Sequence, residues 1–441
     1  MYFQDKNVDV LFFLEHKDRE IEITCELAKH LISKEGLKIA IASELFDLPT
    51  AAFRLRPKVV VTPSTSFAKG SAGAFFFEVF GDRIAYVNLN YEQFLGSWLG
   101  NFKSANHPIS KQLQKHFVWG EHFKNYLLKA GVMKNNIIIT GRPSFSVIAK
   151  NYEGKKDYYR NLLADSLHID PLKKWIFIGL TDGLAFKHDK LVSCLIAYGG
   201  DERKIERHIQ WVKKTIEALI DWIYRLDKDP ELSHTAFILR PHPSVSTRDY
   251  EILISNQVGG IPKNLVISKD HNALSWMAAS DKYYTNFSTL SLESYLLKIP
   301  SYILRPLEEG NDESYWWCDS LPKIQNYDQF RRSILNGDLN REQIDKLREE
   351  ITYYVDVERN ALVETARRIS SLARQVKSYP IWEWKKYLAA ISTNPKRAVG
   401  IYLRRTSAKL RINPFHVIRE GIISDYFDSK EIERRIGTSS R

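Results

Sequence analysis

The sequence predicts an α/β protein with two domains, each built on a parallel β-sheet, followed by a helical, basic C-terminal segment. Three observations lead to this prediction. The chain has 441 residues, enough for two domains of ordinary size plus an appendage. Short apolar runs alternate with stretches of helical periodicity, the pattern that produces parallel sheets with helices on both faces. A polar, charged stretch at residues 151–172 interrupts the alternation and is expected to link the two domains.

The first domain is predicted to span residues 1–150. Val8–Leu14 is a short apolar run suited to a buried strand. Arg19–Gly36 follows with apolar residues at helical spacing and a glycine that stops the helix. Further strands are expected at residues 37–43, 58–64, 83–90 and 135–144, and residues 115–132 are expected to form a strand, a loop and a helix.

The second domain is predicted to span residues 173–340. Strands are expected at residues 175–180, 235–240, 264–268, 282–287 and 300–306, and helices at residues 205–229, 271–280 and 289–299. A helical tract at residues 340–377 follows, and residues 341–441 are expected to form the helical C-terminal region with its basic tail. Because parallel sheets bind ligands beyond the carboxyl ends of their strands, we expect a ligand cleft between the two sheets.

Cysteine content and hydropathy indicate a cytoplasmic protein. Cys25, Cys194 and Cys318 lie far apart without a CxxC spacing, which argues against a disulfide framework or a zinc site. Charges follow the N-terminal apolar run at once, so no signal peptide is expected. The sequence has no run of about 18 apolar residues, so no membrane-spanning helix is expected.

The net charge of +11 is concentrated near the C-terminus, where residues 378–441 carry 13 basic and 6 acidic residues. Two interpretations of residues 382–419 stay open. Aromatic and aliphatic residues beside Lys and Arg suit an interfacial helix on an anionic membrane, which would make the protein peripheral at the inner face of the cytoplasmic membrane. The alternative is a helix packed on the first domain with its charges solvated. Nucleic acid is not expected as a partner, because the charge does not form a stripe beside exposed aromatics.

The stretch "FILRPHPS" is the most unusual loop of the sequence. Arg240 and His242 follow a predicted strand, and Pro241 and Pro243 each fix φ at about −65°, which stiffens the loop. A preorganised guanidinium and imidazole suit an anionic group such as a nucleotide phosphate. A rigid surface turn whose arginine pairs with a carboxylate is the alternative.

A second candidate constellation is "YYTNFSTLSLESYLL". Ser288 and Thr289 stand where a helix is expected to begin, so hydroxyls and free amides could bind a phosphate there. Glu293 lies one helical turn further on and could accept hydrogen bonds from ribose hydroxyls. The alternative is a helix N-cap followed by an acidic residue in the first turn.

Charged residues also crowd the loop after the first strand, in "FFLEHKDRE". Glu15 could act as a general base on an acceptor hydroxyl, and Lys17 or Arg19 could hold a carboxylate or phosphate. A solvated helix start is the alternative.

Weaker candidates border the same predicted cleft. Asp182 and Gly183 in "GLTDGLAF" follow a predicted strand, and Arg142 in "ITGRPSF" ends the last strand of the first domain. Asp227–Asp229 matches a metal-binding DxD only by its letters. No GxGxxG follows a strand and no Walker lysine is present, so the sequence predicts neither a metal nor a cofactor.

These segments, in this order, resemble the bacterial surface carbohydrate biosynthesis proteins. The resemblance covers roughly residues 8–306, and its most specific parts are "FILRPHPS" and "ALSWMAASDKYYTNFSTLSLESYLLKIPSYILRP". More distantly, His242-Pro243 and Ser288-Thr289 look like motifs of bacterial sialyl-, polysialyl- and Kdo-transferases, which use CMP-sugars on a GT-B fold.

The resemblance implies a GT-B-like fold and a metal-independent glycosyltransferase. His242 would contact the CMP phosphate and assist its departure, Ser288 and Thr289 would bind that phosphate, and Glu293 would hold the ribose. Those transferases carry the general base in an acidic motif of the first domain. This sequence lacks it there, because Thr181-Asp182-Gly183 has one acid and lies in the second domain. Glu15 is the remaining candidate for the base.

The predicted function is the transfer of an acidic sugar from a CMP donor to a glycan or glycolipid acceptor in capsule or lipopolysaccharide synthesis. A departing CMP needs no divalent metal if cationic groups neutralise its phosphate. The alternatives are a CDP-glycerol-type phosphotransferase, a UDP-sugar transferase or epimerase, and a non-catalytic partner that binds polysaccharide or lipid.

Overall fold

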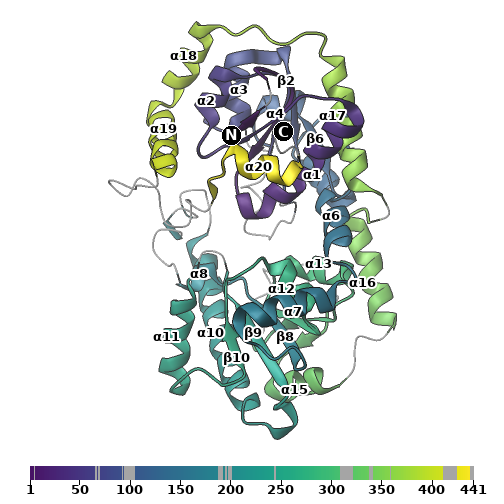
Figure 1. The fold of residues 1–441 in the computed structure, drawn as a ribbon, viewed down its shortest axis with the longest axis vertical. Coiled ribbons are helices and arrows are strands. Elements are labelled where there is room, and N and C mark those ends of the chain that lie inside the picture. The colour runs from purple at the N-terminus through teal and green to yellow at the C-terminus, as the bar shows by residue number, and fades with distance from the viewer. Residues whose placement is uncertain are drawn as a thin grey trace. The chain divides into compact units, whose positions relative to one another are not determined.

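The chain folds into two compact units in the computed structural model (Figure 1). Unit 1 comprises Met1–Gln93, Lys103–Val147 and Thr352–Arg441, and unit 2 comprises Phe94–Phe102 and Ile148–Ile351. The structure describes residues 1–3, 5–64, 67, 70–91, 93, 105–186, 192–193, 196, 201–242, 245–307, 321–336, 341–357, 359–410 and 425–437. Both ends of the chain therefore belong to unit 1.

Unit 1 contains a seven-stranded sheet with the order β1-β3-β2-β4-β5-β6-β7. The strands are β1 (Tyr2–Phe3), β2 (Asn7–Leu14), β3 (Ile39–Ser43), β4 (Arg56–Thr62), β5 (Ala85–Asn88), β6 (Lys115–Val118) and β7 (Ile137–Ile139). All neighbouring strands run parallel except β1, a short strand antiparallel to β3. Strand β1 is not expected from the sequence, because two residues are too short to show a periodicity.

Helices cover both faces of this sheet. They are α1 (Lys17–Glu35), α2 (Leu48–Arg54), α3 (Ala72–Phe80), α4 (Pro108–Gln112), α5 (Glu121–Lys129), α17 (Ala361–Gln375), α18 (Trp384–Thr393), α19 (Pro395–Leu410) and α20 (Ser429–Ile436). Alternate residues of β2 point to opposite faces. Phe12 packs with α1, α17 and α20 on one face, whereas Phe13 packs with α2 and α3 on the other. Gly36 ends α1 in the left-handed conformation, as expected for a helix stop.

The C-terminal part of the chain completes unit 1. The predicted helical tract at residues 340–377 forms two helices, α16 (Arg341–Tyr354), most of which belongs to unit 2, and α17, which belongs to unit 1. The amide of Asp356 bonds to the carbonyl of Trp119 at 2.7 Å, and the side chain of Asn360 caps α17. Ala366, Ile369 and Ala373 recur at helical spacing on α17 and lie in the core with α1.

Unit 2 contains a six-stranded, fully parallel sheet with the order β10-β9-β8-β11-β12-β13. The strands are β8 (Lys174–Gly179), β9 (Thr235–Arg240), β10 (Leu265–Ile267), β11 (Lys282–Thr285), β12 (Ser301–Leu304) and β13 (Lys323–Ile324). Helices are α7 (Lys156–Leu167), α8 (Gly183–Phe186), α10 (Glu202–Leu226), α11 (Thr247–Val258), α12 (Ala273–Ala279), α13 (Leu290–Leu296) and α15 (Tyr327–Leu335), while α6 (Pro143–Tyr152) starts in unit 1 and ends in unit 2. Residues 151–172, predicted as a linker, include α7.

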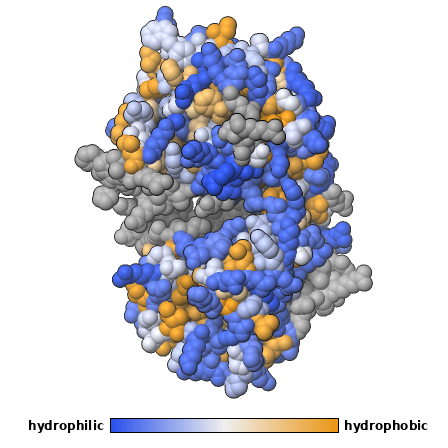
Figure 2. Space-filling view, viewed as in Figure 1, coloured by the Kyte–Doolittle hydropathy of each residue, from blue (hydrophilic) through white to orange (hydrophobic). Residues whose placement is uncertain are grey.

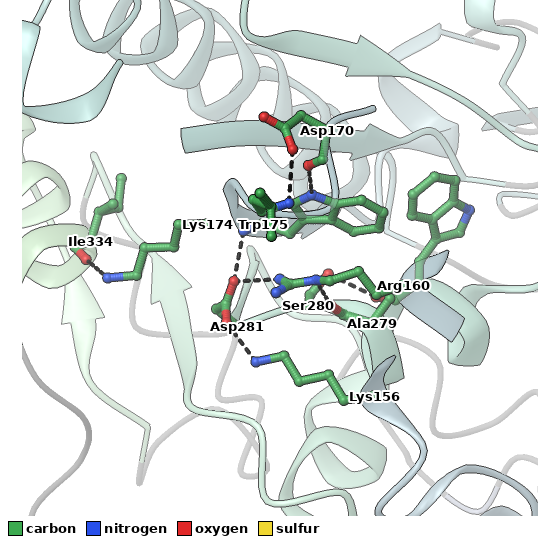
Figure 3. Close-up of polar contacts among 11 residues, drawn as sticks. Lys156, Arg160, Asp170, Lys174, Trp175, Ala279, Ser280, Asp281 and Ile334 are labelled. Carbon is green, nitrogen blue, oxygen red and sulfur yellow. Dashed lines mark hydrogen bonds and ion pairs between the residues drawn. The ribbon is translucent and has the colours of Figure 1, made fainter. Parts of the chain in front are cut away.

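One ion-pair cluster fastens α7 to the amino edge of this sheet (Figure 3). Asp281 precedes β11 and accepts hydrogen bonds from Lys156 Nζ at 2.5 Å, Arg160 Nη2 at 2.6 Å and the amide of Trp175 in β8 at 2.7 Å. Burial of Asp281 works to raise its pKa, but these hydrogen bonds outweigh it and hold the pKa below the ordinary value. Two of the charged residues in 151–172, Lys156 and Arg160, therefore join α7 to the core of unit 2.

Among the described residues, no helix is both long enough and apolar enough to cross a bilayer.

We expect Asp281→Asn to lower the free energy of unfolding by about 2 kcal/mol at pH 7, because Lys156 and Arg160 lose their charged partner. A carboxyl whose pKa is lower in the folded state stabilises fully above its unfolded pKa and loses that effect as the pH falls through the folded pKa. The difference between wild type and variant should therefore shrink below about pH 4. Urea denaturation across this pH range measures it.

The control for this prediction is Glu153→Gln, which breaks the exposed pair between Glu153 and Lys298. Exposed pairs add little to stability, so the urea midpoint of this variant should stay at the wild-type value. An equal loss in both variants would contradict the special role of Asp281.

Candidate functional site

Three loops of unit 2 leave the same edge of its sheet. β8 pairs in parallel with β9 on one side and with β11 on the other, so the carboxyl ends of the three strands are adjacent. Thr181–Asp182 follows β8, Pro241–His242 follows β9, and Asn286–Thr289 follows β11. Since parallel sheets bind ligands at this edge, these loops form the candidate site.

Asp182 connects the loop after β8 to the loop after β9. Its buried carboxylate accepts a hydrogen bond from the amide of His242 at 3.3 Å and another from the hydroxyl of Tyr250 in α11. Burial raises the pKa of Asp182 to about 6, against the lowering effect of the bonds from Tyr250 and the His242 amide. Asp182 therefore holds the backbone of His242 in place, a positioning role that the sequence alone did not reveal.

Asn286 connects the loop after β11 to the loop after β8. The side chain is fully buried, and its Oδ1 accepts from the amide of Thr181 at 2.9 Å while its Nδ2 donates to the carbonyl of Thr181 at 3.0 Å. The same Oδ1 accepts from the amide of Phe287 at 2.9 Å. This side-chain amide continues the pairing of β8 and β11 beyond the last strand residues.

The Ser288–Thr289 pair offers a ligand fewer donors than the sequence predicts. The Ser288 amide donates to Thr285 Oγ1 at 3.0 Å, and Ser288 Oγ accepts from the Leu290 amide at 3.3 Å. Among the described residues, neither the amide nor the hydroxyl of Thr289 has a hydrogen-bond partner. α13 has only 7 residues, so the partial charge at its N-terminus is a minor contribution.

Two arginines lie at this edge, one at the end of β9 and the other after β12, with two strands between them. Arg240 donates to the carbonyl of Asp270 at 3.0 Å, toward the loop after β10 and away from β8. Arg305 follows β12, is buried, stacks over Trp211 at 5.0 Å and donates to the carbonyl of Asn286. Arg305, not Arg240, therefore brings a positive charge to the Ser288–Thr289 loop.

Sequence reasoning missed Arg305 as a site residue, although a signal exists. The four residues Ile-Leu-Arg-Pro occur twice, at positions 238–241 and 303–306, each time at the end of a strand of the same sheet. It also missed Tyr250 and Asn286, which no local pattern marks.

The remaining unit 2 candidates lie beside the same loops. Glu293 is buried in α13, one turn beyond Thr289. Gly183 is the first residue of α8 and follows Asp182 directly. Their contacts with a ribose and a nucleotide stay predictions.

In unit 1, the predicted cations near the end of β2 have carboxylate partners within that unit. Lys17 Nζ pairs with Glu431 of α20 at 2.9 Å, and Arg19 pairs with the buried Glu20 at 2.7 Å. The carboxylate of Glu15 has no hydrogen-bond partner among the described residues. Among the described side chains of this cluster, the carboxylate oxygens of Glu15 are therefore the acceptors that a ligand could use.

A second carboxyl follows the neighbouring strand β3. Glu44 is buried and accepts from the amide of Ala72 at 3.2 Å and from Arg397 Nη2 at 3.3 Å. Burial raises the pKa of Glu44 to about 7; the charge of Glu15 adds to this rise, and Arg397 opposes it. Glu44 was not among the residues predicted from the sequence, although an acid directly after the apolar strand "IAIAS" is a visible signal.

Arg142 is held between two aromatic rings of unit 1. Its guanidinium lies 4.6 Å from the ring centre of Trp119 and 4.8 Å from that of Phe145. Stacking on both rings fixes the direction of this cation.

The acids discounted as metal ligands have structural partners. Asp227 accepts from the amides of Lys263 and Asn264, and Asp229 pairs with Arg331 at 2.5 Å. Within the described ranges, no three His, Cys, Asp or Glu side chains are grouped so that they could hold a metal ion.

No family model matches the sequence, and no curated protein matches it. Solved structures do share the fold. MnaA of S. aureus, solved with UDP, has a TM-score of 0.53 at 13% identity over 85% of this chain and 100% of that one. A histidine-to-asparagine variant of the wall teichoic acid polymerase TagF, soaked with CDPG, has a TM-score of 0.53 at 12% identity over 84% of this chain and 90% of that one. A proposed UDP-N-acetylglucosamine 2-epimerase from Listeria monocytogenes has a TM-score of 0.51 at 11% identity over 86% and 99%.

These similarities confirm the predicted fold class. The protein has a GT-B-like fold, with two α/β units whose sheets are parallel except for β1. At this level of sequence identity the similarity is evidence for the fold alone.

We expect Asp182→Asn to change how stability depends on pH. A carboxyl whose pKa is raised by folding binds its proton more tightly in the folded state, so wild-type stability falls as the pH rises through the window from the unfolded to the folded pKa. That window runs from about pH 4 to about 6. The free energy of unfolding of Asp182→Asn, relative to wild type, should therefore increase from pH 4 to pH 7 in urea denaturation.

Tyr250→Phe provides the companion measurement. The hydrogen bond from Tyr250 lowers the pKa of Asp182, so its loss should move the fall in stability to higher pH. Parallel stability curves for wild type and Asp182→Asn would show that the carboxyl does not titrate as described.

Proposed function

We propose that the protein is a glycosyltransferase of bacterial surface polysaccharide synthesis, using a nucleotide-activated sugar. One observation carries the proposal. The buried Asp182 carboxylate holds the backbone of His242 at the carboxyl edge of the unit 2 sheet, the edge that also bears the Ser288–Thr289 loop. Donors from more than one loop on one sheet edge suit a phosphate, so this arrangement supports the proposal.

The donor phosphate is proposed to bind between these loops. His242 donates to the phosphate and assists its departure, while the amide and hydroxyl of Thr289 and the hydroxyl of Ser288 bind its oxygens. Arg305 supplies a buried positive charge behind the loop, and Arg240 supplies one at the rim. Cations and oriented donors that neutralise a departing phosphate take over the part that a metal plays elsewhere.

Glu293 is proposed to accept from the ribose hydroxyls of the donor nucleotide. It lies one helical turn from Thr289, so a nucleotide whose phosphate meets Thr289 could bring its ribose to this carboxylate. Asp182 and Gly183 shape the same loop edge, Asp182 through the backbone of His242.

The acceptor hydroxyl is proposed to bind at the carboxyl edge of the unit 1 sheet. Glu15 takes the proton of that hydroxyl as its oxygen bonds to the anomeric carbon, and the bond from that carbon to the phosphate oxygen breaks with release of the nucleotide. Glu44 lies close enough for the charge of Glu15 to raise its pKa. Arg142 is proposed to hold the carboxylate of an acidic sugar or a glycan phosphate, and Lys17 and Arg19 would do so only by leaving their carboxylate partners.

A CMP-linked acidic sugar is the first candidate donor, with a sialic acid- or Kdo-like residue transferred to a glycan or glycolipid. The second candidate is a CDP-glycerol-type phosphotransferase or an enzyme acting on a UDP-sugar. The fold shared with TagF soaked with CDPG and with MnaA bound to UDP favours keeping these donors in the test. The proposed location of the protein is the cytoplasmic face of the membrane where such glycans are assembled.

Calorimetric titration of CMP, CDP and UDP against the purified protein tests the donor class. We expect saturable binding of one cytidine or uridine nucleotide without added metal, with CMP the tightest. Mass spectrometry of donor turnover with the matching nucleotide-sugar then tests transfer. Absence of binding by all three nucleotides would favour the non-catalytic alternative, a protein that binds polysaccharide or lipid.

His242→Ala is expected to weaken nucleotide binding by about tenfold or more, because a donor to the phosphate is lost. The matched control is His234→Ala, which changes an exposed histidine just before the opposite end of the same strand β9. Calorimetry should give a wild-type dissociation constant for this control. Equal affinities for His242→Ala and wild type would remove His242 from the phosphate site.

Thr289→Val is the mildest probe of the second loop, because the Thr289 hydroxyl has no hydrogen-bond partner among the described residues. It should leave the thermal midpoint unchanged and weaken nucleotide binding by about tenfold. Unchanged affinity with an unchanged midpoint would contradict the proposed role of this loop.

A further inference from the structure

Helix α19 has two apolar faces, and one of them packs on unit 1. Ile401 and Ala408 are buried on that inner side. Two arginines on the same side pair with acids of unit 1: Arg397 with Glu44 at 3.3 Å and Arg405 with Asp47 at 2.8 Å. The inner face of α19 therefore accounts for part of the apolar residues and for part of the positive charge of the tail.

The other apolar face of α19 is open to solvent. Val399, Tyr402, Leu403 and Leu410 are 58%, 66%, 45% and 61% exposed. At about 100° per residue they fall within roughly one third of the helix circumference, opposite the buried side. Scattered exposed apolar residues are ordinary, but four on one face of one helix, interrupted only by Thr406, are not explained by packing within the chain.

Two lysines border this stripe. Lys396 and Lys409 fall on its two sides at the same helical spacing, and neither has a carboxylate partner among the described residues. The basic residues of α19 thus differ between its two faces. The inward Arg397 and Arg405 pair with acids, whereas the outward Lys396 and Lys409 face solvent.

Helix α18 continues the pattern. Trp384 and Leu388 are exposed one turn apart, and Lys385 beside them is exposed as well. Apolar side chains come to the surface over α18 and α19 in Figure 2. The sequence contains no acidic residue from Trp384 to Leu410, so nothing on these two helices would repel an anionic surface.

We propose that the outer face of α18 and α19 docks on an anionic lipid surface. This face is defined by Trp384, Leu388, Val399, Tyr402, Leu403 and Leu410 with the flanking Lys385, Lys396 and Lys409. An apolar stripe bordered by lysines matches an interfacial helix, in which the apolar side chains enter the acyl boundary and the lysines reach the headgroup phosphates. The inference concerns this surface alone and stands whether or not the protein transfers a sugar.

A lipid surface fits better than a protein partner for a reason of charge. The stripe is flanked on both sides by cations of one sign, and an anionic bilayer presents negative charge on both sides of any such stripe. A protein interface would also be expected to use the paired hydrogen-bonding groups that a polar rim provides, and the outer stripe offers mainly hydrocarbon.

Flotation of the full-length protein with vesicles tests the inference. Vesicles of phosphatidylglycerol and phosphatidylcholine should bind the protein, and pure phosphatidylcholine vesicles should bind it at least about tenfold more weakly, because each lysine contributes to the attraction. Binding to the anionic vesicles should weaken as salt is raised. Equal binding to both vesicle types, or none to either, would overturn the proposal.

Two pairs of variants locate the surface. Tyr402→Ser combined with Leu403→Ser should weaken vesicle binding by at least about tenfold, because apolar area no longer enters the bilayer. The control pair is Leu172→Ser with Ile252→Ser, two exposed apolar residues of unit 2, and it should bind vesicles like wild type. Similar losses in both pairs would overturn the assignment to α19.

A second pair of variants, which removes lysine charges, keeps the test informative if the apolar double variant folds poorly, as circular dichroism would show. Lys396→Gln with Lys409→Gln should weaken binding to anionic vesicles by about tenfold or more, whereas Lys134→Gln with Lys263→Gln should not. Polyglutamate serves as the probe for an acidic protein partner. Tight binding of polyglutamate through the same lysines without vesicle binding would replace the lipid surface by an acidic macromolecule, and nucleotide affinity should stay at the wild-type value throughout.

Discussion

The buried carboxylate of Asp182 is the contact on which the candidate site of unit 2 depends. It accepts from the amide of His242 and from the hydroxyl of Tyr250, so one side chain ties the loops after β8 and β9 to helix α11. Asn286 does the same for the loops after β8 and β11. Because both side chains are buried and bonded to backbone groups, the three loops form one connected edge and not three independent surface turns.

The residues at this edge fall into two groups, those that hold the loops in place and those that are exposed enough to contact a ligand. Asp182, Asn286 and Tyr250 are buried and hydrogen-bonded within the protein, and they hold the loops in place. His242 and Thr289 lie in these loops and are only partly buried. In unit 1 the division follows charge. Lys17 and Arg19 pair with carboxylates of their own unit, whereas the carboxylate of Glu15 has no hydrogen-bond partner among the residues that the structure describes.

Charge is also divided between the two faces of helix α19 in the basic tail. The two interpretations of the sequence, packing on the first domain and docking at a membrane, need not exclude each other. The inner face of α19 packs on unit 1 through Ile401, Ala408 and the paired arginines Arg397 and Arg405. Its outer stripe exposes apolar side chains, and the flanking Lys396 and Lys409 have no carboxylate partner in the part of the chain that the structure describes. One helix can pack on unit 1 with one face and expose the other face, because residues half a turn apart point in opposite directions.

The sequence by itself determined strands β2 to β12, the longest helices, the two parallel sheets and the edge on which the candidate loops lie, because apolar periodicity and strand–helix alternation are local patterns. Only the tertiary structure decided the direction and partner of each side chain. It turned Lys17 toward Glu431, Arg240 toward Asp270, and the C-terminal helices back onto unit 1. Such contacts join residues far apart in the chain, so they leave no repeat or spacing that a single sequence could reveal.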